Sequence, residues 1–161
     1  MKAASLFIAL LAAAVLLGWL ALSGLGGGVS SADPAALFES LSGTMDLSGT
    51  TASDAGLIRR LYGVDPADYE YVALICPSDN MGVTELFLAK TSDPAAAERA
   101  RDGALSRLES QKTSFDGYGD DQYSILTSHS VVKNERGFVL FAVTENDREL
   151  IRVFEAGIRG A

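Results

Sequence analysis

The residues best suited to contact a ligand lie between positions 107 and 123, where charged, amide and aromatic side chains follow one another. Residues three or four apart share one face of a helix, which places Arg107 beside Gln111 and both near Ser114. Tyr118 and Tyr123 extend this polar face with aromatic rings, a combination suited to a peptide or a glycan. The alternative is that both tyrosines pack the end of the helix against the sheet. The predicted binding surface comprises Arg107, Gln111, Tyr118, Gln122 and Tyr123.

Three aspartates in a glycine-containing loop raise the hypotheses of a calcium site and of carboxylate-dependent hydrolysis. They are Asp116, Asp120 and Asp121. Oxygen-rich loops do hold calcium, but this spacing does not match the alternating acidic pattern of a calcium-binding loop. The alternative is a solvated loop with a helix-capping aspartate. We therefore expect no metal and no cofactor.

The single histidine and the single cysteine offer little for nucleophilic catalysis. His129 is flanked by Ser128 and Ser130, but neighbours in a strand point to opposite faces. We expect a partly exposed structural histidine at the start of a strand. Cys76 cannot form an intrachain disulfide, and we interpret it as a buried thiol at the end of a strand rather than a nucleophile.

Two glutamates on neighbouring predicted strands, Glu70 and Glu85, are candidates for an acid–base pair across a hairpin. Acid–base work requires a cleft that raises one pKa, and the sequence predicts none there. Edge or surface charge is the expected role of both. The charges of the long helix, those of Arg99, Arg101, Arg107 and Glu109, are assigned mainly to its solvated side.

The N-terminal quarter of the sequence predicts that the rest of the chain lies outside the cytoplasm. The uncharged apolar run from 6 to 22 would rise about 26 Å as a helix, slightly less than a hydrocarbon core of roughly 30 Å. Lys2 is the sole Lys or Arg before Arg59, which predicts that the N-terminus stays inside. Residues 30–32 offer small side chains to a signal peptidase, but their distance from the apolar run favours a retained anchor.

The chain accordingly divides into three parts. Residues 1–23 are a signal peptide or transmembrane anchor, 24–32 a flexible Gly/Ser linker, and 33–161 one extracytoplasmic domain, which would be secreted if the signal is cleaved. The chain carries 13 Lys and Arg against 21 Asp and Glu, a formal net charge of −8. This balance argues against nucleic-acid binding, and against docking on anionic lipid headgroups through a basic surface.

Periodicity and turn residues predict an α+β domain with a four-stranded, mainly antiparallel sheet. Its ββαββα core follows two short helices, and the helices are expected over one face of the sheet. The continuously apolar segment 138–143 predicts a central strand covered on both faces. The repeated strand–strand–helix order suggests a duplication. The expected helices are 33–43, 51–63, 93–115 and 146–158, with one further turn at 123–127, and the expected strands are 69–76, 83–91, 130–133 and 138–144.

Several segments carry a resemblance to a known family. These are Leu61-Tyr-Gly-Val-Asp65 with Tyr69-Glu, Glu85-Leu-Phe-Leu-Ala-Lys90, the stretch from Arg107 to Tyr118 with Gln122-Tyr, and Gly137-Phe-Val-Leu-Phe. Over about residues 54–154 the chain resembles the domain-of-unknown-function family numbered four-three-five-eight, uncharacterised exported domains of mostly Gram-positive bacteria. The resemblance implies a signal, lipoprotein or anchor segment before one α+β domain. It implies no activity, cofactor or catalytic residue, and Cys76 lies too deep in the domain to carry a lipid anchor.

The expected function is a non-enzymatic, membrane-tethered domain that binds an envelope protein, peptide or glycan. The first alternative is a small hydrolase or transferase that uses the carboxylates at 116–121. The second is a cation- or small-ligand-binding domain.

Overall fold

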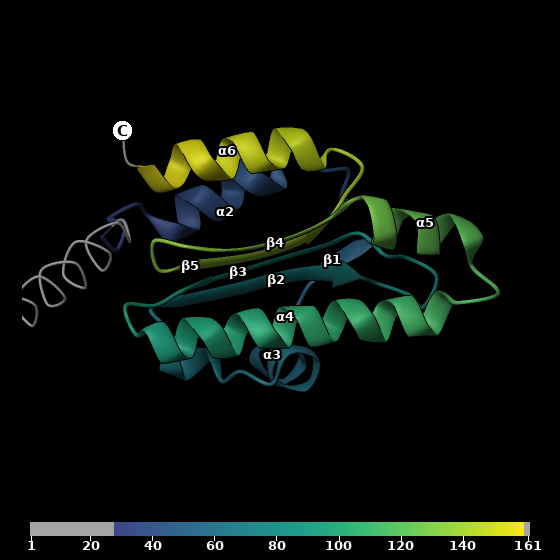
Figure 1. Ribbon diagram of the computed structural model, residues 1–161, viewed down its shortest axis with the longest axis horizontal. Coiled ribbons are helices and arrows are strands. Elements are labelled where there is room, and N and C mark those ends of the chain that lie inside the picture. Colours follow the sequence, from purple (N-terminus) through teal and green to yellow (C-terminus); the bar gives the residue numbers. More distant parts are fainter. Residues whose placement is uncertain (1–27, 160–161) are drawn as a thin grey trace, which may run out of the picture.

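The computed structural model describes residues 28–159, which form a three-layer arrangement of helices on both faces of one sheet (Figure 1). The sheet is antiparallel throughout, with strand order β1-β2-β3-β5-β4. The strands are β1 (Thr50–Ala52), β2 (Tyr71–Pro77), β3 (Glu85–Lys90), β4 (Ser130–Glu135) and β5 (Phe138–Val143). Among the described residues, β2, β3 and β5 are therefore interior strands, with β3 at the centre of the sheet.

Aspartate caps start three of the helices. The sequence predicts the caps at Asp33 and Asp93, whereas the helix predicted from residue 51 begins only after Asp54, because residues 50–52 form a strand. Asp33, Asp54 and Asp93 each accept hydrogen bonds from backbone N–H groups of the following first turn. The helices are α2 (Pro34–Ser42), α3 (Ala55–Tyr62), α4 (Pro94–Phe115), α5 (Asp120–Ser128) and α6 (Asp147–Arg159), with a 3₁₀ turn at Pro66–Asp68. Gly63 ends α3 with a left-handed φ of 67°, which favours glycine.

Both faces of the sheet are covered, so the prediction of helices over one face is wrong. Helices α3 and α4 cover one face, and α2 and α6 cover the other (Figure 1). Phe87 and Phe141 belong to the core under α3 and α4, whereas Leu88 and Leu140 belong to the core under α2 and α6. All six residues of β3 and all six of β5 are buried. Because successive side chains of a strand point to opposite faces, strands that are apolar on both sides need a helical layer on each. The two strand–strand–helix segments are present, but their helices α4 and α6 cover opposite faces.

The sheet has five strands where four were predicted. The additional strand β1 pairs with the end of β2 and is three residues long, too short to produce a periodic pattern. Strand β4 extends to Glu135 and turns into β5 through Arg136 and Gly137 alone, both with positive φ. Helix α5 covers nine residues where one turn was predicted. In each case the sequence pattern covers fewer residues than the strand or helix that forms once tertiary contacts are made.

The predicted anchor or signal at 1–23 and the first part of the predicted linker lie outside the described residues. Within residues 28–159, no helix combines the length and the apolar character that crossing a membrane requires. From Gly28 onward the chain lies against the domain. Ser30 is buried, its N–H donates to the carbonyl of Arg136, and its own carbonyl accepts from the Lys90 ammonium.

Candidate functional site

A carboxylate at the start of a central strand is completely buried. Glu85 has a relative exposure of 0%, and it shares the α3/α4 face of β3 with Phe87 and Ala89. An isolated buried carboxylate is costly, so its hydrogen-bond partners decide whether it is tolerated. The expectation that Glu85 is surface charge is therefore wrong, whereas Glu70 is exposed and lies at the opposite end of the β2–β3 hairpin.

Three side chains from two helices bind the carboxylate of Glu85. The hydroxyl of Tyr62 donates to Oε1 over 2.5 Å, and Gln111 Nε2 donates to Oε2 over 2.9 Å. Arg107 donates through Nε to Oε1 at 3.0 Å and through Nη2 to Oε2 at 2.7 Å. This bidentate guanidinium–carboxylate pairing is the strongest geometry available to two such groups. Both oxygens are thus occupied by donors.

Close contact between α3 and α4 brings these groups together. A Cβ on Gly103 would overlap the carbonyl oxygen of Tyr62, so glycine at this position allows the end of α3 to rest on α4. The Tyr62 ring stacks on Phe87 at a centroid distance of 4.1 Å and an interplanar angle of 10°. The helix crossing and the ring stack together direct the Tyr62 hydroxyl to Glu85.

Burial and mutual charge shift the pKa values of the partners. Burial, followed by the charge of Glu85 and the hydrogen bond to it, raises the pKa of Tyr62 well above its ordinary value, so the phenol stays protonated and donates. Burial opposes the charge of Arg107, but the hydrogen bonds and charge of Glu85 outweigh burial and raise the pKa of the guanidinium. The network is therefore one carboxylate held by a cation and two neutral donors.

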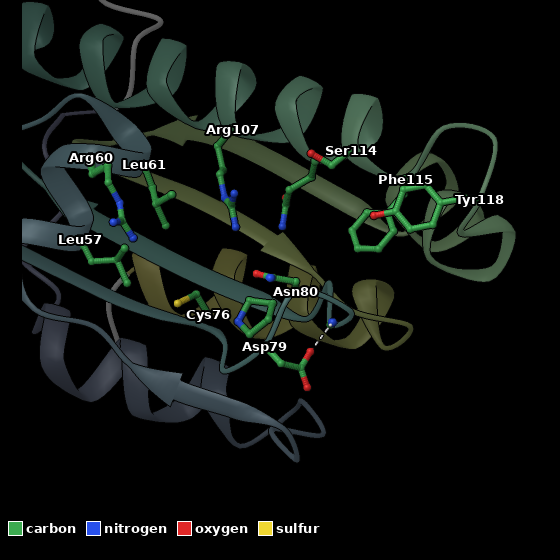
Figure 2. A pocket seen from close by; sticks show the side chains of 13 residues that line it. Leu57, Arg60, Leu61, Cys76, Asp79, Asn80, Arg107, Ser114, Phe115 and Tyr118 are labelled. Carbon is green, nitrogen blue, oxygen red and sulfur yellow. Dashed lines mark hydrogen bonds between the residues drawn. The ribbon is translucent and has the colours of Figure 1, made fainter.

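A groove of about 500 Å³ lies over this network, between α3, α4 and the loop that joins β2 to β3. Figure 2 shows Arg60 and Arg107 extending into it from the two helices, opposite Asp79 and Asn80 of the loop. Asp79 Oδ1 accepts from the backbone N–H groups of Met81 and Gly82, which shapes the loop. The apolar part of the lining comprises Leu57, Leu61, Cys76, Pro77, Phe115 and Tyr118.

Within the groove one buried polar atom lacks a partner. Gln111 is only 4% exposed, and Glu85 requires a donor from its amide, which orients Nε2 toward the carboxylate. The other amide atom, Oε1, has no hydrogen-bond partner among the described residues. Such an atom ordinarily has a protein, water or ligand donor, so this acceptor marks the part of the lining that is incomplete.

The structure brings together only part of the predicted binding surface. Arg107, Gln111 and Tyr118 line the groove with Ser114, whereas Gln122 and Tyr123 lie on α5, outside the groove lining. Tyr118 is 65% exposed and stacks on Phe115 with the ring centroids 5.8 Å apart. Tyr123 is also exposed, and neither tyrosine belongs to the buried core, so they do not pack the helix exit onto the sheet.

The other candidate residues do not converge on a site. Asp116, Asp120 and Asp121 are exposed, and no cluster of residues suited to a metal ion occurs within 28–159. His129 Nδ1 lies 3.5 Å from Asp147 Oδ1, without a hydrogen bond to a hydroxyl among the described residues. Cys76 is buried, as predicted, with its Sγ 3.0 Å from Ser53 Oγ.

Sequence reasoning did not assign Tyr62 or Arg60 to the site, and it did not predict that Glu85 is buried. One signal was available, because Glu85 directly precedes the apolar run of a strand that is covered on both sides. Acidic residues are almost never fully buried without a partner, so a charge at that position implies a cation elsewhere in the chain. Nothing local identifies which cation.

Comparison with known proteins gives one match. The model of a family described as a domain of unknown function, DUF4358, matches residues 44–144, which contain the whole Glu85 network and the groove lining. No curated protein and no solved structure matches the chain.

Proposed function

We propose that this chain, which belongs to the DUF4358 family of domains of unknown function, is a non-enzymatic binding domain of the cell envelope that holds its partner in the groove over Glu85. The observation that carries the proposal is the combination of a saturated buried network with an open groove above it. Donors occupy both oxygens of Glu85, so this carboxylate is poorly placed to accept a proton from a substrate. Its effect is to hold Arg107 and Gln111 in fixed positions along the groove.

The mixed lining of the groove supports binding of a partner surface. Tyr118, Leu57 and Leu61 offer apolar and aromatic contact area, while Arg60 and Asn80 offer hydrogen bonds. Interfaces are enriched in tyrosine and arginine because both combine contact area with directional polar groups. A protein, a peptide or a glycan of the envelope would use these groups.

The proposal includes a location of the domain outside the cytoplasm, where an N-terminal anchor holds it to the membrane. It is supported by the apolar run at 6–22 and by the lack of Lys and Arg between Lys2 and Arg59 in the sequence. A test uses Ser124→Cys, because Ser124 is exposed and the native Cys76 is buried. A membrane-impermeant maleimide should label this variant in intact cells and leave the parent chain unlabelled. Labelling that requires cell lysis would contradict the proposed location outside the cytoplasm.

Site-specific photo-crosslinking in intact cells tests the binding role. A photoreactive residue at position 114 lies in the groove lining, and the same residue at position 102 lies on an exposed position of α4 outside the lining. Position 114 should give an adduct of defined mass with one envelope component, and position 102 should not. Equal adducts at both positions, or none at position 114, would overturn the assignment of the groove.

A further inference from the structure

We infer that the ligand of the groove is a peptide C-terminus, with its carboxylate held by Arg60 and Arg107 and its last amide N–H donated to Gln111 Oε1. The inference rests on the proposed function and specifies the chemistry of that same groove. It follows from the groups in the lining that the fold leaves without partners.

Two guanidinium groups are available to one anion. Arg60 is exposed and makes no ion pair with any residue of 28–159, whereas its neighbour Arg59 is paired with Asp65 at 2.8 Å. Glu85 engages Nε and Nη2 of Arg107, and Nη1 has no hydrogen-bond partner among the described residues. Both side chains extend into the groove (Figure 2). Because Glu85 holds Arg107 in place, little side-chain entropy is lost when Nη1 binds an anion.

The remaining groups distinguish a carboxylate from a phosphate. Glu85 and Asp79 together offset the two guanidinium charges, so the groove has no excess positive charge for a doubly charged phosphate. A singly charged carboxylate needs only Arg60, which neither acid pairs, beside the free Nη1 of Arg107. The partnerless Gln111 Oε1 offers an acceptor to a donor on the ligand. A peptide C-terminus supplies a planar carboxylate, an N–H close to it, and a side chain for the apolar lining of Leu57, Leu61 and Phe115.

A pair of probes that differ in one group tests the inference on the full-length chain in detergent micelles. N-acetyl-alanyl-alanine carries a free carboxylate, and its C-terminal amide has the same shape without the charge. In an NMR titration up to roughly 10 mM, the acid should shift the Gln111 side-chain signals and bind at least about tenfold more tightly than the amide. Equal affinities, or no shift with the acid, would overturn the inference.

Neighbouring arginines provide matched variants. Arg60→Gln should weaken binding of the acid about tenfold and leave the weak binding of the amide unchanged, because the variant removes one guanidinium. Arg59→Gln removes an arginine whose partner is Asp65, outside the groove lining, and should leave both affinities unchanged. Equal losses in the two variants would indicate only general electrostatic attraction and would overturn the assignment to Arg60.

Failure of this inference can be distinguished from failure of the proposed function. If position 114 gives its adduct in cells but the acid and the amide bind alike, the groove binds a partner of other chemistry and only the inference fails. If the acid binds selectively and no adduct forms, the carboxylate site stands and the envelope-binding role fails. N-acetyl-aspartic acid α-amide has a free side-chain carboxylate and no free C-terminus. If it binds as well as the acid, the ligand is an acidic side chain and not a peptide terminus, which would also overturn the inference.

Discussion

The two ends of strand β3 both bury a charge, and they accommodate it in different ways. Glu85 begins the strand on the α3/α4 face, and Lys90 ends it on the α2/α6 face. Side chains of Tyr62, Arg107 and Gln111 surround Glu85, and one of them carries the opposite charge. Lys90 Nζ instead donates to the backbone carbonyl of Ser30 at 2.9 Å and lies 4.6 Å from the centroid of the Phe138 ring.

The partners at the Lys90 end come from the N-terminal part of the described chain. The carbonyls of Gly28 and Ser30 accept from Arg136 and Lys90, so this segment is fastened to the β4–β5 turn and to the end of β3. Burial lowers the pKa of Lys90, and the charge of Glu70 only partly opposes this shift. The Lys90 end therefore holds a chain segment, whereas the Glu85 end fixes side chains beneath an open groove.

Removing the cation at each end of β3 should give the largest difference in stability between the two ends. Arg107→Met leaves Glu85 buried without a cation and should lower the free energy of unfolding by about 3–5 kcal/mol. Lys90→Met removes a buried charge whose partners are a neutral carbonyl and a ring, and should change the free energy by less than about 1 kcal/mol in either direction. Urea unfolding of the full-length chain, followed by circular dichroism, measures both effects.

A second substitution separates lost charge pairing from lost packing at the Glu85 end. Adding Glu85→Leu to Arg107→Met removes the unpaired charge and should restore roughly half of the lost stability. If the double variant is no more stable than Arg107→Met, packing of the arginine stem is the main contribution and the electrostatic contrast between the two ends is wrong.

The helix contacts on the two faces should differ in how they tolerate a methyl group. In Gly103→Ala the new Cβ meets the backbone carbonyl of Tyr62, which cannot move without displacing α3, and we expect a loss of about 2–3 kcal/mol. In Gly157→Ala the nearest atom, at 2.5 Å, is the terminal Cδ1 of Leu37. A rotamer change and the higher helix propensity of alanine should keep this loss below about 1 kcal/mol. Thermal melts that rank the two variants in the opposite order would show that α3 does not depend on Gly103.

Alkaline pH should change the free energy of unfolding in opposite directions through the two ends of β3. These pH-dependent changes are the smallest of the expected effects. The raised pKa of Tyr62 means that its contribution is complete below about pH 10 and is lost at higher pH, as tyrosine ionises more readily in the unfolded chain. Tyr62→Phe should cost about 1–2 kcal/mol at neutral pH and lose less stability than the parent between about pH 10 and 11.

At the other end, the lowered pKa of Lys90 means that the cost of burying its charge is full at neutral pH and disappears as pH rises toward about 10. The parent should therefore gain stability relative to Lys90→Met over that range, in urea titrations repeated at each pH. Parallel pH profiles for the parent and both variants would contradict the assignments at both ends.

The sequence carries clear signals for most elements of the fold. Aspartate–proline pairs locate the starts of α2 and α4, and the unbroken apolar segment at 138–143 identifies a central strand that is covered on both faces. These signals are local, since a cap or a periodic pattern extends over a few residues. The strand β1 and most of α5 lacked such signals, and their extent depends on the sheet edge and the helix against which they pack.

Only part of the candidate site could be predicted from the sequence, for the same reason. The spacing of Arg107 and Gln111 places both on one face of α4, and the sequence alone determines that placement. Tyr62 and Glu85 lie 23 residues apart, and Arg107 lies 22 residues beyond Glu85, so their meeting depends on which faces α3 and α4 present to the sheet. Helix crossing at Gly103 and stacking on Phe87 decide this, and both are long-range contacts. The sequence determined the chemical groups and the elements that carry them, and only tertiary packing decided that a carboxylate would be buried among three donors under a groove.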